Sequence, residues 1–111
     1  MTNVPVTGRP AIRVSAVDAD AWLFAALERL DPDRTLPPSV ATAIRDTAQV
    51  FYSLADITPT DKAFAAYVIA NAYAEVNDTP SALTWAREAV SLNPNSRSYQ
   101  ALVTSLSGRT P

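Results

Sequence analysis

The 111-residue chain contains no cysteine and no histidine. Without cysteine it can form no disulfide, no thiolate nucleophile and no thiolate-bound metal site. Without histidine it lacks the commonest general base and the commonest ligand of transition metals. We therefore expect neither a metal nor a cofactor.

Glycine is also scarce, since Gly8 and Gly108 are the only two in the chain. A phosphate-binding loop needs closely spaced glycines that let the backbone approach the ligand, and no such loop is present. The carboxylates that could serve in catalysis fall mainly at expected helix ends, where capping and solubility explain them. These residues are Asp18, Asp20, Asp31, Asp33 and Asp56. The sequence thus predicts a protein that is not an enzyme.

Positive charge and long apolar runs are lacking as well. Nine basic residues face eleven acidic ones, giving a net charge of −2, whereas a nucleic-acid binder needs a basic surface to displace counterions. No run approaches the roughly 18 apolar residues of a membrane span, and the first residues show no charged start followed by an apolar core. We expect a cytoplasmic protein whose partners are neither nucleic acids nor membranes.

Prolines and capping residues divide the chain into helices. Thr58 before Pro59, and Thr79 before Pro80, have the order of an N-cap followed by the first helical residue. The expected helices span 19–30, 38–56, 59–76, 80–92 and 96–107, with Asp18 and Asn95 as further caps and Gly108 as a left-handed end. Because no stretch is a convincing strand, we predict five helices in one all-α domain over residues 18–108, between an arm at 1–17 and a tail at 109–111.

Small residues recur at helical spacing in the segment "SALTWAREAVSLNPNS". Ala82, Ala86 and Ala89 are four and three residues apart, which places them on one face of a helix. A face of methyl groups lets other helices approach closely. We expect the segment 59–76 on one side of this face, the segment 96–107 on the other, and Trp85 across their junction.

The same alanines belong to a longer pattern of 34 residues. Its key positions are Ala66, Ile69, Ala70, Tyr73, Ala82, Ala86, Ala89 and Pro94. In this order and spacing, residues 63–96 resemble one near-complete tetratricopeptide repeat. Ala66 and Ala70 depart from the family's Trp and Gly, and Trp85 stands next to the aromatic position, which Ala86 occupies.

The resemblance implies antiparallel helical hairpins stacked as a short right-handed superhelix. Residues 18–60 then read either as a degenerate repeat with an enlarged loop or as an unrelated helical hairpin packed on the repeat. The segment 96–107 looks like the lone helix that commonly ends such arrays.

Proteins of this family bind a peptide or a partner's helix on the concave side, without chemistry of their own. By resemblance, the partner-binding residues are Phe64, Tyr67, Asn71, Glu75 and Leu102, with Ala74 in the same stripe. The basic residues that capture a C-terminal carboxylate are missing, because Tyr67, Ser98 and Leu102 stand in their places. An apolar or mixed peptide would suit this surface better. The alternative is that Phe64 and Tyr67 only pack against the second expected helix, 38–56.

The segment 19–30, "AWLFAALERL" at its centre, is apolar around nearly its whole circumference. Such a helix must be covered on more than one side, either by the N-terminal arm or by a second molecule. The candidate homodimer interface consists of Trp22, Leu23, Phe24 and Leu27. The alternative function is therefore a structural homodimerisation module that binds no peptide.

Overall fold

The computed structural model of the chain describes residues 16–30 and 36–109, which form five α-helices and no strand. The helices are α1 (Ala16–Arg29), α2 (Pro38–Tyr52), α3 (Pro59–Glu75), α4 (Thr79–Leu92) and α5 (Arg97–Arg109). The predicted all-α class with five helices is confirmed. Most of the expected arm, residues 1–15, lies outside the described residues, and Ala16 and Val17 already belong to α1.

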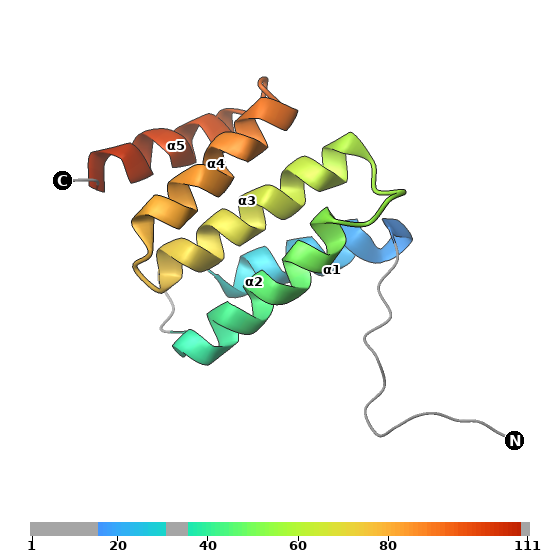
Figure 1. The fold of residues 1–111 in the computed structure, drawn as a ribbon, viewed down its shortest axis with the longest axis horizontal. Helices are drawn as coiled ribbons and strands as arrows, with labels where there is room; N and C mark the ends of the chain where they lie inside the picture. The colour runs from blue at the N-terminus through green and yellow to red at the C-terminus, as the bar shows by residue number, and fades with distance from the viewer. Residues whose placement is uncertain (1–15, 31–35, 110–111) are drawn as a thin grey trace, which may run out of the picture.

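Helix α3 is the centre of the fold. It packs against α4 and α2 along its length and against α1, while α5 packs on α4. In Figure 1, α2, α3 and α4 lie side by side as consecutive antiparallel rods, with α1 behind them and α5 beyond α4. Helices α3 and α4, which hold the repeat-like segment, are therefore direct neighbours, as the alanine pattern predicted.

Local capping explains why α3 begins where it does. The hydroxyl of Thr58 accepts a hydrogen bond from the backbone N–H of Asp61 at 3.1 Å, and Pro59 is the first helical residue. The Asp61 carboxylate in the first turn complements the positive end of the helix dipole. The predicted start of this helix is confirmed.

The turn between α3 and α4 differs from the prediction. Asn77 adopts a left-handed conformation with φ of 64°, and the N–H groups of Asn77 and Asp78 donate to the carbonyls of Ala74 and Tyr73. This pattern of paired bonds closes α3. Asp78 then caps α4 by accepting from the Ser81 N–H at 3.3 Å, so the cap is Asp78 and not Thr79.

Three other predicted helix ends are wrong. Helix α1 begins at Ala16, so Asp18 lies in its first turn instead of capping it. Helix α2 ends at Tyr52, four residues before the expected Asp56. Helix α5 is capped by Ser96, which accepts from the Tyr99 N–H at 3.3 Å, in place of Asn95.

Gly108 also departs from its predicted role as a left-handed stop. It lies within α5, which continues to Arg109, and its backbone does not adopt a positive φ. Glycine is needed at a helix end only where the chain turns into the left-handed region. In the described part of this chain, Asn77 is the residue that does so.

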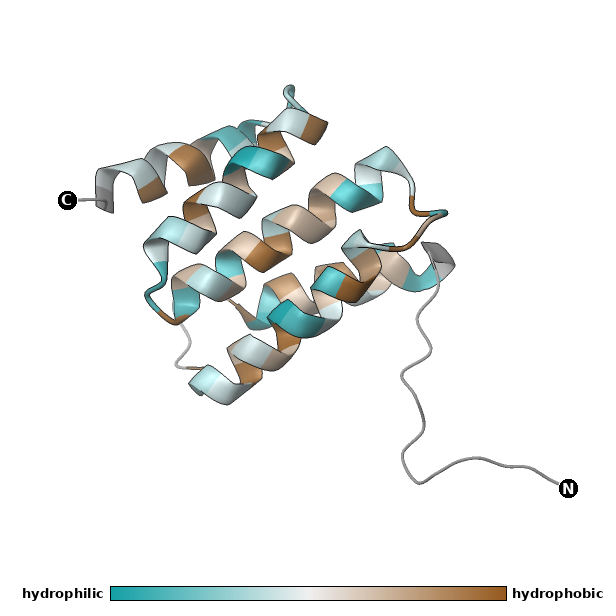
Figure 2. Cartoon of the chain, in the orientation of Figure 1, coloured by the Kyte–Doolittle hydropathy of each residue, from teal (hydrophilic) through white to brown (hydrophobic). Residues whose placement is uncertain are grey.

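Two apolar clusters form the core. The first joins α1, α2 and α3, and its largest buried side chains are Leu23, Phe51, Val68 and Ile69. The second joins α3, α4 and α5 through Ala70, Ala82, Ala86 and Leu106. Ala82 and Ala86 are fully buried between the helices expected to flank them, so this prediction is confirmed. Figure 2 shows the central turns of α3 pale to brown, whereas α2 and α4 also carry hydrophilic residues on their outer turns.

Candidate partner-binding surface

The residues predicted to bind a partner lie on a recessed helix. Every residue of α3 from Asp61 onward is buried or half-buried, because α3 is surrounded by α1, α2 and α4. Phe64, Tyr67, Asn71 and Glu75 are all half-buried and follow one stripe of the helix, as the sequence spacing requires. We call this stripe, together with Ala74 and with Tyr99 and Leu102 of α5, the α3 surface.

An aromatic pair joins α3 to α5 in this surface. The rings of Tyr67 and Tyr99 have centroids 4.7 Å apart and planes tilted by 37°, a separation typical of favourable aromatic contacts. Burial raises the pKa of the Tyr99 hydroxyl, with smaller contributions from Tyr67 and from the negative charge of Asp61. Tyr99 was not among the predicted site residues. Its spacing of three residues from Leu102 is the signal that could have placed it on the same face.

Asn71 is already engaged within its own helix. Its Nδ2 donates a hydrogen bond to the carbonyl oxygen of Tyr67 at 2.9 Å. One of its two amide N–H bonds is therefore used to orient the side chain beside the tyrosine pair. The expected contact of Asn71 with a bound backbone would use the second N–H or the carbonyl oxygen.

The two large apolar side chains of the α3 surface, Phe64 and Leu102, also contribute to the core. Phe64 packs against the first cluster, and Leu102 packs against the second. Both are half-buried, so each has an inner contact and an outer edge. One side of the Phe64 ring therefore packs against the neighbouring helices, and the other side is left for a partner.

The charged residues along the α3 stripe are acidic, since Lys62 of α3 and Arg45 of α2 each lie over a tyrosine ring. Lys62 lies over the ring of Tyr52 with Nζ 4.9 Å from the centroid. Arg45 lies over the ring of Tyr73 at 5.2 Å. Asp61 and Glu75, near opposite ends of α3, remain as the charges along the stripe.

The four α1 residues predicted at a homodimer interface are placed differently from one another. Leu23 has no exposed surface and belongs to the first cluster, where it cannot touch a second molecule. Trp22 is half-buried against Phe51, with ring centroids 5.3 Å apart, and Leu27 is also half-buried. Phe24 is 58% exposed, so it is the member of the set that α1 presents outward.

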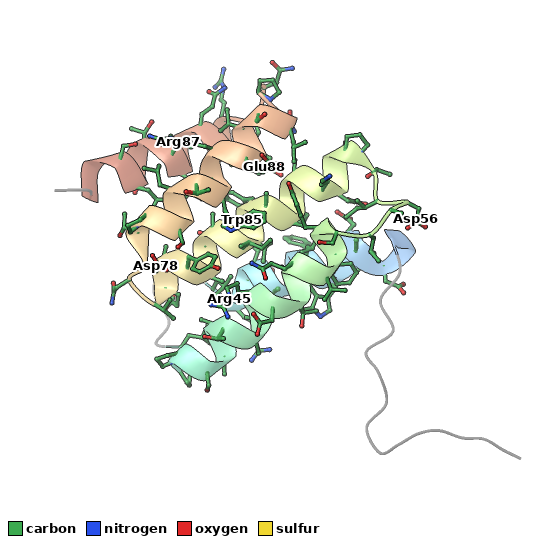
Figure 3. The ribbon with its side chains drawn as sticks, in the orientation of Figure 1. Arg45, Asp56, Asp78, Trp85, Arg87 and Glu88 are labelled. Carbon is green, nitrogen blue, oxygen red and sulfur yellow. The ribbon has the colours of Figure 1, made fainter. Side chains whose placement is uncertain are left out.

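A junction between α2 and α4 was not anticipated from the sequence. The Tyr52 hydroxyl donates to the Glu88 carboxylate at 2.5 Å, and the Tyr52 ring meets Trp85 edge-on with centroids 4.9 Å apart. Figure 3 shows Trp85 on α4 directed over α3 toward α2. Trp85 packs against both clusters, but its aromatic partner is on α2 and not on α5.

Within the described ranges, no three acidic side chains converge into a group that could hold a metal ion. No helix there has the length and apolarity needed to cross a membrane. No family model, curated protein or solved structure gives a significant match to this chain.

Proposed function

We propose that this protein is a non-enzymatic interaction or assembly module that binds a peptide or a partner's helix on the α3 surface. The observation that supports the proposal is the Tyr67–Tyr99 pair, in which two helices present half-buried aromatic rings at one place. Rigid aromatic side chains with polar edges are the residue type most enriched at protein interfaces.

The chemistry of the surface defines the partner that would suit it. Phe64, Tyr67 and Leu102 offer apolar contacts, Asn71 offers an amide, and Asp61 and Glu75 add negative charge. The partner segment is therefore expected to be apolar in its centre and to carry lysine or arginine near its ends. A segment that ends in a free carboxylate is disfavoured, because Tyr67, Ser98 and Leu102 stand where a carboxylate-binding cation would be expected.

Site-specific photocrosslinking in the native host tests this proposal. A photoreactive phenylalanine analogue replaces Tyr67 in one variant and Val50 in a control. Val50 suits the control because it is a 46% exposed apolar residue on α2. The proposal predicts a crosslinked partner from position 67 that is absent from position 50, with the crosslink in an apolar segment flanked by basic residues.

The captured segment is then synthesised and titrated against purified protein. The Tyr67→Ala/Asn71→Ala double variant should bind it at least about tenfold more weakly than wild type, a loss of about 1.4 kcal/mol, while its circular dichroism stays helical. Equal affinity of the folded double variant would refute the α3 surface as the binding site.

A further inference from the structure

The exposed face of α1 has an unusual composition for a surface helix. Ala21, Phe24, Ala25 and Glu28 are all exposed, and their spacing of three, four and seven residues places them on one stripe. Three of the four are apolar. The two alanines flank Phe24 without obstructing it, so another helix could approach this face closely.

An open cleft lies between α4 and α5, the last two helices of the chain. It has a volume of about 310 Å³ and is lined by Arg87, Val90, Gln100, Val103 and Thr104. Val90 and Val103 are half-buried, so they form its apolar floor, while the other three are exposed. The residues of α5 from 98 to 108 include no charged side chain, and its exposed side is polar through Ser98, Gln100, Thr104, Ser105 and Ser107.

The two faces are complementary in charge. The outer side of α1 carries Asp20 and Glu28, both exposed. The α4–α5 cleft carries Arg87, and Arg97 is exposed at the start of α5. In the part of the chain that the structure describes, the ion pair present joins Arg45 to Asp46 of α2, so it neutralises neither face.

We propose that the occupant of the α4–α5 cleft is α1 of a second copy of this chain, with Phe24 placed over Val90 and Val103. Such a contact joins two different faces of the same protein. It therefore adds copies head to tail, either into an open chain with one free face at each end or into a closed ring with none. In both, each added α1 continues the stack of helices. This assembly uses neither Tyr67 nor Tyr99, so it stands independently of the proposed peptide binding.

Sedimentation equilibrium on the full chain tests the proposal, with variants confined to exposed side chains. Phe24→Glu disables the α1 face, and Arg87→Glu/Thr104→Glu disables the cleft. Val50→Glu is the matched control because it also replaces an exposed apolar residue. Wild type and Val50→Glu should show a mass that rises with concentration, up to about 1 mM, to more than twice the 11.9 kDa of one chain.

Each disabled variant alone should remain monomeric, whereas an equimolar mixture of the two should form a heterodimer and nothing larger. The mixture retains one intact α1 face and one intact cleft, which is enough for a single contact. Raising the salt concentration from 0.05 to about 0.5 M should weaken this heterodimer at least about tenfold, because the charge pairs are screened.

Four results would overturn the proposal. One is a wild-type protein that stays monomeric over the whole concentration range. A second is a cleft variant that still dimerises alone while Phe24→Glu does not, which would indicate a two-fold contact of α1 with α1. The third is a pair of folded variants that each assemble as wild type does. The fourth is a mixture of the two folded variants that forms no heterodimer.

Discussion

Tyr52 of α2 and Glu88 of α4 are 36 residues apart in the chain and are joined by a hydrogen bond of 2.5 Å between hydroxyl and carboxylate. The bond bridges two helices that flank α3 on either side, and Trp85 and Lys62 contact the same tyrosine ring. The relationship explains how α2, which contributes to the first cluster, is connected to α4, which contributes to the second.

Tyr52→Phe should lower the free energy of unfolding by about 1 kcal/mol. A hydrogen bond to a charged group contributes about 1.5–3 kcal/mol when its loss leaves a buried charge, and the half-buried Glu88 can recover part of this from water. Urea denaturation measures the difference. Glu88→Gln keeps an acceptor for Tyr52 and should cost less. A Tyr52→Phe protein as stable as wild type would show that the bridge contributes nothing.

The stability of the protein should also fall at high pH because of the same residue. Burial, followed by the bond to Glu88, raises the pKa of Tyr52 to about 12 from 10.0. A group whose pKa is raised on folding keeps its full contribution below the unfolded value and loses it as the pH rises through the folded value.

The melting temperature of wild type should therefore decline between about pH 10 and 12. The decline should be smaller in Tyr52→Phe, which has no hydroxyl to ionise at this position. Thermal melts followed by circular dichroism at half-unit steps provide the measurement. Parallel pH profiles of the two proteins would contradict the assignment.

Trp85→Ala should destabilise the protein by about 3 kcal/mol, near the lower limit for removing a large aromatic side chain. The ring is half-buried and packs against both clusters, so its loss weakens the contact between them. Trp85→Phe keeps an aromatic neighbour for Tyr52 and should lose less. A melting temperature of Trp85→Ala within about two degrees of wild type would mean that the indole is dispensable.

Enlarging an alanine between α3 and α4 should be costly as well. Ala86 has no exposed surface, and a leucine there must displace a helix or adopt a strained rotamer, which typically costs about 1–3 kcal/mol. Ser91→Leu on the exposed side of α4 is the control, and it should change stability little. If guanidinium denaturation ranks the two variants equally, the helices are not in close contact at this position.

The turn between α3 and α4 gives a prediction of opposite sign for two small substitutions. Asn77→Ala should cost about 1 kcal/mol, because a residue with a β-carbon and no local hydrogen-bonding group is disfavoured in the left-handed region. Asn77→Gly should be as stable as wild type or slightly more so, since glycine adopts a positive φ without steric penalty. The melting temperatures of both variants test this prediction. If both fall by the same amount below wild type, residue 77 does not adopt a left-handed conformation.

The sequence predicts a helix end correctly where residues within one turn of that end determine it. The order Thr58–Pro59 determines the start of α3 because both the cap and the proline act within one turn. The boundary at Asp78 was missed because two adjacent residues could each cap α4, and only the closing bonds of α3 decide between them. Similarly, the N-terminal limit of α1 could not be located from Asp18 alone.

The sequence by itself determined the helical class and the alanine face. Proline positions, caps and a period of 3.6 residues are properties of the chain over short distances. Only the tertiary structure decided which apolar residues of α1 are internal, because Leu23 and Phe24 are adjacent in a helix that is apolar on nearly every side. It also brought Tyr67 to Tyr99, Tyr52 to Glu88, and the two walls of the α4–α5 cleft together, since these contacts depend on how whole helices cross, which no local pattern encodes.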